Sequence, residues 1–280
     1  MADATIAPAP ELRFRRRIRL GAVLRELWQA RELVRSLAER ELRARYKQAI
    51  LGFAWAVVTP LALMVVFTLF LQRVARIDTG GVPYPLFAYL GLVPWGFFSS
   101  GASAGGQSLV SNIPLLNKIY CPREVFPLAS IGVAAVDSLV AFGVLGAIFA
   151  LTGTVPRMTS LWVPVLVLVQ VIFTVGVTFV VSALVVYLRD LRHAIPVIIQ
   201  LGLFATPVAY GIDVVPPQFH VLYSALNPMA PVIDGYRRTM LYGQPPDWLL
   251  LGVGAATAVT LLVAGYYLFK RLEAGFADVA

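Results

Sequence analysis

The sequence predicts an all-α protein that crosses a membrane six times. Three observations predict this fold: the composition, the length of the uncharged stretches and the distribution of basic residues. Hydrophobic residues make up 59% of the 280 residues and charged residues only 14%, whereas soluble domains carry about 25% charged residues. A soluble domain of this size could not cover its water-facing surface with so few charges. The composition therefore excludes a soluble enzyme, a disordered chain and a fibrous protein.

Stretches without a charged residue mark the expected spans. Neighbouring charges are separated by uncharged stretches of 25, 39, 31, 20 and 22 residues, and a spanning helix needs about 20. A further apolar segment is interrupted once, by Asp137. Within a membrane domain over 49–270, the expected spans are residues 50–72, 85–108, 125–151, 161–188, 194–212 and 248–269.

Basic residues predict the orientation of these spans. With six spans, both termini share a side with the loops 109–124 and 189–193. That side carries 18 Lys and Arg, and the other side carries 5. Because basic residues concentrate on the cytoplasmic side, both termini are predicted to be cytoplasmic. The net charge of +8 thus reflects topology, and no nucleic-acid partner is expected because no recognised binding module accompanies it.

The segments before the first span and after the last one are predicted to lie outside the bilayer. Residues 1–19 form a flexible basic tail without a signal peptide, and residues 271–280 form a short C-terminal tail. Residues 20–48 carry apolar residues at helical spacing with charges of both signs between them. This pattern predicts an amphipathic helix that lies against a partner or, as an equal alternative, touches only lipid.

A cationic cluster stands where this helix meets the first span. Arg43, Arg45 and Lys47 surround Tyr46. At headgroup depth such a cluster can bind phosphate through its charge and the planar arginine fork. It could equally serve only to fix the orientation of the chain.

Two connecting segments are too unusual to be plain loops. Residues 109–124 are strongly apolar for a cytoplasmic loop, and a short helix over about 109–122 would offer a docking site for another protein. The alternative is a helix folded back onto the bilayer. Residues 213–247 contain several prolines, which favours two short helices at the outer membrane surface, separated by Asn227 and Pro228. Packing filler is the alternative there.

The second span carries an aromatic stripe. Tyr84, Phe87, Trp95 and Phe98 fall on one face of a helix. Such rings can stack against the apolar faces of sugars. An interfacial aromatic belt with ordinary packing explains the first two rings equally well, but Trp95 lies about 16 Å further along the helix.

The chain lacks the residues for several kinds of chemistry. None of its three lysines belongs to a phosphate-binding loop, so ATP and Mg²⁺ are expected only in a partner. No metal or other cofactor is expected, because Cys121 is the sole cysteine and the two histidines stand alone. The Gly-x-Ser-x-Gly pattern over 101–105 lies within an apolar helix, where small residues favour close helix contact over catalysis.

Asp137 is an acid deep within a predicted span. Intramembrane carboxylates often mark ion pathways, so it allows a proton-driven secondary carrier. The other five spans lack the acids and histidines that such carriers use, which favours a neutral or hydrogen-bonded structural role.

Five stretches of the sequence resemble, in the same order, the membrane subunit of bacterial polysaccharide ABC exporters. These type-2 permeases export O-antigen, capsule or teichoic acid chains. The resemblance spans about residues 30–280. The stretches that carry it are 40–61, 81–98, 117–129, 226–243 and 276–279.

The resemblance implies a partner set and a location. Members of this family are homodimers in the bacterial inner membrane, each copy paired with a cytoplasmic ATP-binding cassette subunit. Their substrate is a glycan on an undecaprenyl-diphosphate lipid. The implied function is export of a lipid-linked polysaccharide driven by ATP in the partner, with no covalent chemistry in this chain. The alternatives are a permease for a drug or small lipid, and the proton-driven carrier that depends on Asp137.

The resemblance also implies roles for particular residues. The diphosphate would enter at Arg43, Arg45, Tyr46, Lys47 and Gln48. The coupling helix toward the ATPase would include Asn117, Lys118, Ile119, Tyr120 and Arg123. The outer gate would include Asn227, Pro228, Tyr236 and Arg237. The conduit would be lined by Tyr84, Phe87, Trp95 and Phe98.

Overall fold

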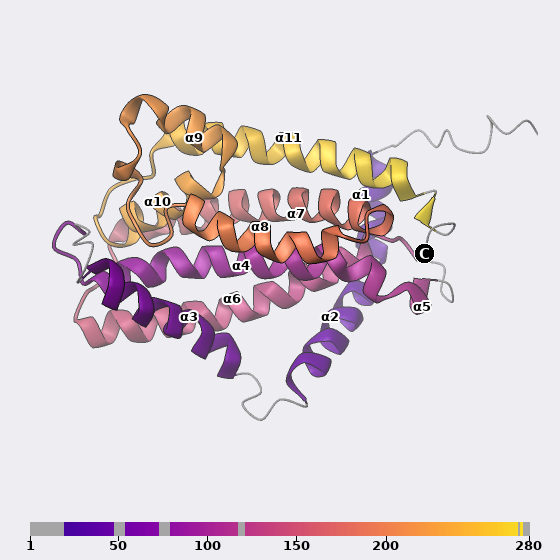
Figure 1. Ribbon diagram of the computed structural model, residues 1–280, viewed down its shortest axis with the longest axis horizontal. Helices are drawn as coiled ribbons and strands as arrows, with labels where there is room; N and C mark the ends of the chain where they lie inside the picture. Colours follow the sequence, from indigo (N-terminus) through magenta and orange to yellow (C-terminus); the bar gives the residue numbers. More distant parts are fainter. Residues whose placement is uncertain (1–19, 48–53, 73–78, 117–120, 274, 277–280) are drawn as a thin grey trace, which may run out of the picture.

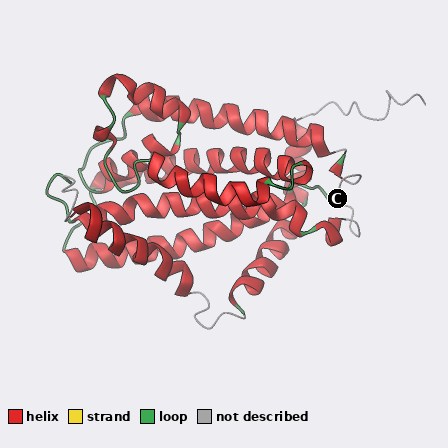
Figure 2. Cartoon of the chain, in the orientation of Figure 1, coloured by secondary structure: helices red, strands yellow, loops and turns green. Residues whose placement is uncertain are grey.

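The structure is a computed structural model that describes residues 20–47, 54–72, 79–116, 121–273 and 275–276. Every regular element within these ranges is a helix, as Figure 2 shows. The long helices run side by side along one axis of the molecule (Figure 1). This arrangement confirms the predicted all-α class.

The central helix of the bundle is α4 (Tyr84–Ser111). It contacts α6 (Val125–Thr152), α7 (Val163–Tyr187) and five further elements. A Cβ atom on Gly101 or Gly105 would lie less than 3.0 Å from a threonine side chain of α7. The small residues of the Gly-x-Ser-x-Gly pattern therefore let two helices approach closely.

In the described part of the chain, three helices are long and apolar enough to cross a bilayer by themselves. They are α6, the segment Met158–Tyr187 that joins η4 (Met158–Trp162) to α7, and α11 (Trp248–Glu273). The first and fifth predicted spans are shorter apolar helices. These are α3 (Trp55–Phe67), continued by η3 (Thr68–Gln72), and α8 (Leu191–Ala205).

At one end of the bundle the segments outside the spans differ from the prediction. Residues 20–46 form two helices, α1 (Leu20–Gln29) and α2 (Arg31–Tyr46), instead of one. α2 packs against α6 of its own chain, where it buries Leu37. Of the expected helix over about 109–122, the first residues belong to α4, which continues through Ser111, and α5 (Ile113–Leu116) follows as a separate short helix, while 117–120 lie outside the described residues. α1, α5 and the C-terminal end of α11 lie at this end (Figure 1).

The opposite end carries the segment predicted as short outer helices. It contains η5 (Ile212–Val214), η6 (Pro217–Phe219), α9 (His220–Leu226) and α10 (Met229–Met240). The residues between α9 and α10 are Asn227 and Pro228, as expected. The residues of α10 are mostly buried against α4, α7 and α11, and the position of both helices at the membrane surface stays a prediction.

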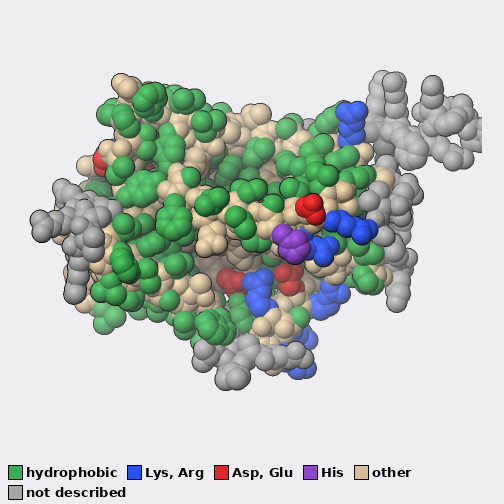
Figure 3. Space-filling model, in the orientation of Figure 1, with side chains coloured by type: hydrophobic (Ala, Val, Ile, Leu, Met, Phe, Trp, Pro, Cys, Tyr) green, Lys and Arg blue, Asp and Glu red, His purple; other side chains and the backbone are tan. Residues whose placement is uncertain are grey.

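Charged side chains are distributed unevenly along the bundle. Hydrophobic side chains cover the left and middle of the face in Figure 3, and most of the charged ones lie toward the end that holds α1 and α5. This pattern fits a bundle that presents an apolar belt to lipid and one charged end to water.

Candidate functional site

A cavity of about 670 Å³ lies between five helices. Its walls come from α2, α3, α4, α6 and α8. Each of α3, α4 and α8 carries an internal proline beside or within the cavity wall: Pro60, Pro94 and Pro196. A proline inside a helix removes one backbone hydrogen bond and favours a bend. Bends in neighbouring helices leave room between them.

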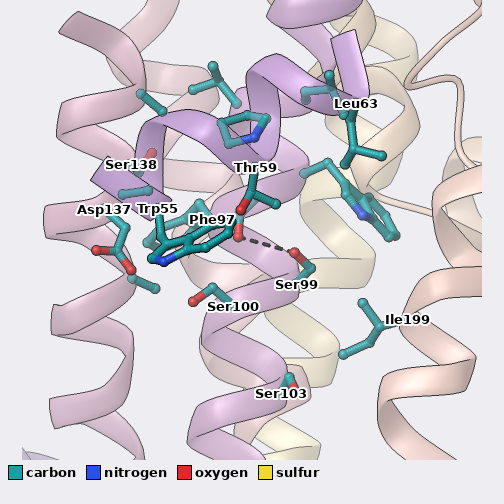
Figure 4. A pocket seen from close by; sticks show the side chains of 18 of the residues that line it. Trp55, Thr59, Leu63, Phe97, Ser99, Ser100, Ser103, Asp137, Ser138 and Ile199 are labelled. Atoms are coloured by element: carbon teal, nitrogen blue, oxygen red, sulfur yellow. Dashed lines mark hydrogen bonds between the residues drawn. The ribbon is translucent and has the colours of Figure 1, made fainter. Parts of the chain in front are cut away.

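One face of α4 supplies hydroxyl groups to this cavity. Ser99, Ser100 and Ser103 follow Gly96 at offsets of 3, 4 and 7 residues, so they share one side of the helix. Figure 4 shows them along α4, with Asp137 of α6 on one side and Ile199 of α8 on the other. The Ser99 hydroxyl donates to the Gly96 carbonyl at 3.2 Å. The spacing of small and polar residues in this apolar helix was a signal that the sequence analysis missed.

Aromatic rings line the same cavity. Trp55 of α3 is 52% exposed, whereas Trp95 and Phe97 of α4 are almost buried. Rings beside hydroxyl groups suit a ligand that is polar at its edges and apolar on its faces. Trp55 and Phe97 were not among the predicted site residues, because neither falls on the predicted aromatic stripe.

The predicted aromatic stripe divides into two parts. Trp95 lines the cavity and lies 5.2 Å from the Phe98 ring, which stacks on Phe173 of α7. Tyr84 and Phe87 lie outside the cavity wall. The Tyr84 hydroxyl donates to the Ala209 carbonyl at 2.7 Å, and both side chains are buried. Tyr84 thus contacts the segment after α8, and the Phe87 ring lies under Arg237 of α10.

The predicted cationic cluster also divides. Arg45 and Tyr46 line the cavity. Arg43 points away from the cavity. Its side chain is 78% exposed and pairs with Glu39 at 3.5 Å. Lys47 is exposed at the end of α2, and Gln48 lies outside the described residues. The structure thus brings two of the five predicted residues to the cavity.

Asp137 faces these two residues across the α2–α6 contact. Its Oδ2 atom accepts from Arg45 Nη1 at 2.7 Å, and its Oδ1 atom accepts from the Tyr46 hydroxyl at 2.5 Å. Asp137 is therefore hydrogen-bonded, as one of the two sequence interpretations held. It also forms an ion pair with the Arg45 guanidinium.

The predicted gate residues are tied into the bundle. The Arg237 guanidinium is fully buried and donates to the carbonyls of Phe87, Pro207, Val208 and Tyr210. It also lies 3.7 Å from the centre of the Phe87 ring. The Tyr236 hydroxyl donates to the Gln170 side chain at 3.2 Å.

The remaining gate residues anchor the start of α10. Asn227 donates to the Thr206 hydroxyl at 2.8 Å. Pro228 precedes α10 and lies where a Cβ atom on Gly254 of α11 would meet it at 3.5 Å. These contacts join the end of α8, α9, α10 and α11 into one packed unit.

Most of the predicted coupling residues lie outside the described residues. These are Asn117, Lys118, Ile119 and Tyr120. Arg123 donates to the Glu273 carbonyl and lies 5.5 Å from the centre of the Phe276 ring. The adjacent Glu124 is buried and pairs with Lys270 of α11. The sequence analysis did not single out Glu124, because a lone acid at a helix start carries no distinctive pattern.

The sequence pattern of the ABC-2 type transporter family matches residues 32–241. The chain belongs to the ABC-2 type transporter family. The matched range includes every residue of the ABC-2 cavity wall, from Arg45 to Leu203.

Several curated proteins resemble this ABC-2 chain over nearly their whole length. The O-antigen export system permease protein RfbA of Myxococcus xanthus is 32% identical over 257 residues, which is 91% of this chain and 98% of that protein. A protein of the same name from Klebsiella pneumoniae is 28% identical over 89% of this chain and 95% of its own. The polysialic acid transport protein KpsM of Escherichia coli is 24% identical, over 86% and 93%.

Proposed function

We propose that this chain is the membrane permease subunit of an ATP-driven exporter that moves a lipid-linked polysaccharide out of the cytoplasm. The observation that carries the proposal is the cavity, where tryptophan rings and a serine face stand side by side. Relatives that match over most of their length are named for export of O-antigen and transport of polysialic acid. A glycan has hydroxyl edges and apolar ring faces, and this wall offers partners for both.

The proposed topology has six spans with both termini in the cytoplasm of a bacterial cell, and the chain lies in the inner membrane. α4 and the two shorter helices α3 and α8 complete the set that α6, α7 and α11 begin. The strong excess of Lys and Arg on one side supports this orientation. The placement of α1, α5 and the C-terminal end of α11 at one end of the bundle is consistent with it (Figure 1).

The proposed assembly contains a second copy of the chain and two ATP-binding cassette subunits. This chain has no phosphate-binding loop, so ATP and Mg²⁺ would bind in those subunits and no cofactor in this one. The segment 109–122 would act as the coupling element. Arg123 and its neighbour Glu124 contact the end of α11. A movement of this segment would therefore be transmitted directly to that membrane helix.

The proposed path of the substrate begins at the α2 end of the cavity. Arg45 offers the planar fork that suits a phosphate group, and the glycan would follow along the serine face and the rings. The packed unit around Asn227, Pro228, Tyr236 and Arg237 would form the outer gate. Its buried contacts mean that opening must move α10 together with the segment after α8.

The proposal is tested by export in cells that carry the chain with its ATP-binding partner. Trp55→Ala removes an exposed cavity ring, and we expect about fivefold less polysaccharide at the cell surface, since a lost ring contact is worth roughly 1 kcal/mol. Trp162→Ala is the matched control, because Trp162 is 42% exposed and does not line the cavity. Surface polysaccharide is measured by antibody or lectin binding, normalised to chain abundance. Equal export by both variants would contradict the stacking role.

A further inference from the structure

Arg45 is held by two carboxylates at the wall of the cavity. Its Nη1 atom lies 2.7 Å from Asp137 and its Nη2 atom lies 3.5 Å from Glu41. Glu41 in turn accepts from the Ser130 hydroxyl at 2.9 Å. The side chains of Arg45 and Asp137 are 34% and 19% exposed, so both remain within reach of a ligand in the cavity.

Asp137 has a second partner that does not depend on Arg45. The Tyr46 hydroxyl donates to its other carboxylate oxygen at 2.5 Å. Burial, together with this hydrogen bond, raises the pKa of Tyr46 to about 12, so the hydroxyl keeps its proton at neutral pH. Each oxygen of Asp137 therefore has its own donor.

Arg45 and Asp137 are the charged residues among those that line the cavity in the described part of the chain. Their charges cancel each other. The oxygens of a phosphate group accept hydrogen bonds from the planar guanidinium fork, as the oxygens of a carboxylate do. The Nη1–H group of Arg45 that points at Asp137 can donate to that carboxylate or to a phosphate, but not fully to both.

We propose that Asp137 is a built-in competitor for the phosphate of the lipid carrier, which must displace the carboxylate from Arg45 to bind. This inference rests on the proposed function, in which the substrate carries a diphosphate headgroup. In this geometry the replacement of the Asp137 carboxylate by phosphate should cost little free energy. After displacement Asp137 keeps the Tyr46 hydroxyl and Arg45 keeps Glu41, so neither charge is left without a partner. When the headgroup leaves, Asp137 pairs with Arg45 again. The site therefore releases its substrate instead of retaining it.

The proposal predicts opposite effects for the two members of the pair. Asp137→Asn removes the competing charge and should tighten phosphate binding about twofold to fivefold, the range expected for a partly exposed ion pair. Arg45→Ala should abolish the binding. Tyr46→Phe takes away the second partner of the displaced carboxylate and should weaken phosphate binding. Asp190→Asn and Arg157→Ala remove the same charges at exposed positions away from the cavity and serve as controls.

Binding is measured with the purified full-length chain by calorimetry in detergent, using inorganic pyrophosphate as the probe. A second arm places the chain in nanodiscs that contain undecaprenyl diphosphate or uncharged undecaprenol, to separate a lipid headgroup from a free anion. Thermal unfolding of each variant verifies that it is folded. Asp137→Glu keeps the charge and should bind pyrophosphate like the wild type.

Three results would overturn the proposal: unchanged or weaker pyrophosphate binding by Asp137→Asn, unchanged binding by Arg45→Ala, or no preference for undecaprenyl diphosphate over undecaprenol. The failure of the proposed function is recognised separately. If Asp137→Asn does not change affinity while the wild-type chain exports polysaccharide, the competition is wrong and the exporter stands. If Asp137→Asn tightens both probes while wild-type cells export no polymer, the anion site stands and the exporter is wrong.

Discussion

Arg237 offers the sharpest test of how the end of the bundle near α9 and α10 is held together. Its guanidinium donates to three carbonyls of the non-helical segment after α8, those of Pro207, Val208 and Tyr210, at 2.8, 2.5 and 2.7 Å. Arg237→Met keeps most of the buried volume and removes all three donors. Each buried acceptor left without a partner costs about 1–3 kcal/mol. We therefore expect a loss of at least about 3 kcal/mol in the free energy of unfolding.

This loss should appear as a lower midpoint of thermal unfolding in detergent. For a chain of this size, 1 kcal/mol shifts the midpoint by about 2–4 °C, so the expected drop is about 6–12 °C. Arg237→Lys should lie between the wild type and Arg237→Met, because an ammonium lacks the planar fork. The assay heats the purified chain and measures the folded fraction by size-exclusion chromatography.

The neighbouring arginine provides a matched control. Arg238 is only half-buried, and its side chain donates a hydrogen bond to the Pro245 carbonyl at 3.1 Å. Arg238→Met should therefore cost less than about 1 kcal/mol. If Arg237→Met and Arg238→Met lowered the midpoint equally, the carbonyl cluster would not be a main source of stability at this end of the bundle.

Three further predictions concern helix packing and the cytoplasmic end. Gly265→Ala should destabilise the chain by about 1–3 kcal/mol, since its Cβ would lie 2.7 Å from a backbone oxygen of α7. The Cβ of Gly252→Ala meets nothing within 4 Å, so this variant should be neutral or slightly stabilising in the same thermal assay. Lys270→Met leaves the buried Glu124 without its cation and should cost about 3–5 kcal/mol, with much of the loss recovered by adding Glu124→Gln. Burial raises the pKa of the Cys121 thiol, although Arg123 partly offsets this. Maleimide should therefore label Cys121 more slowly than glutathione at pH 7, and the labelling rate should keep rising to a higher pH. An identical pH profile of the two labelling rates would contradict this.

Particular residues show where sequence reasoning reached the site and where it stopped. Arg45, Tyr46 and Trp95 were predicted and do line the cavity. Arg43 carries the same charge two residues before Arg45, yet it points to solvent, because neighbours two apart on a helix face different directions. Only the position of α6 against α2 determines which arginine meets Asp137.

The predicted aromatic stripe gives a similar lesson. Four rings share a face of α4, but that face meets different neighbours along its length. Phe87 packs under Arg237 from α10, a residue 150 positions further along the chain. Periodicity identifies a face of a helix, and it contains no information about what packs against each turn.

The sequence alone determined the apolar all-α character of the chain, the approximate limits of its long helices and the segregation of basic residues, because composition and local spacing govern partition into lipid. The tertiary structure decided that α10 enters the bundle, that Trp55 and the serine face of α4 share one cavity, and that Asp137 pairs with Arg45. These features depend on contacts between residues far apart in the chain, where the free energy of packing and of buried hydrogen bonds outweighs any local preference.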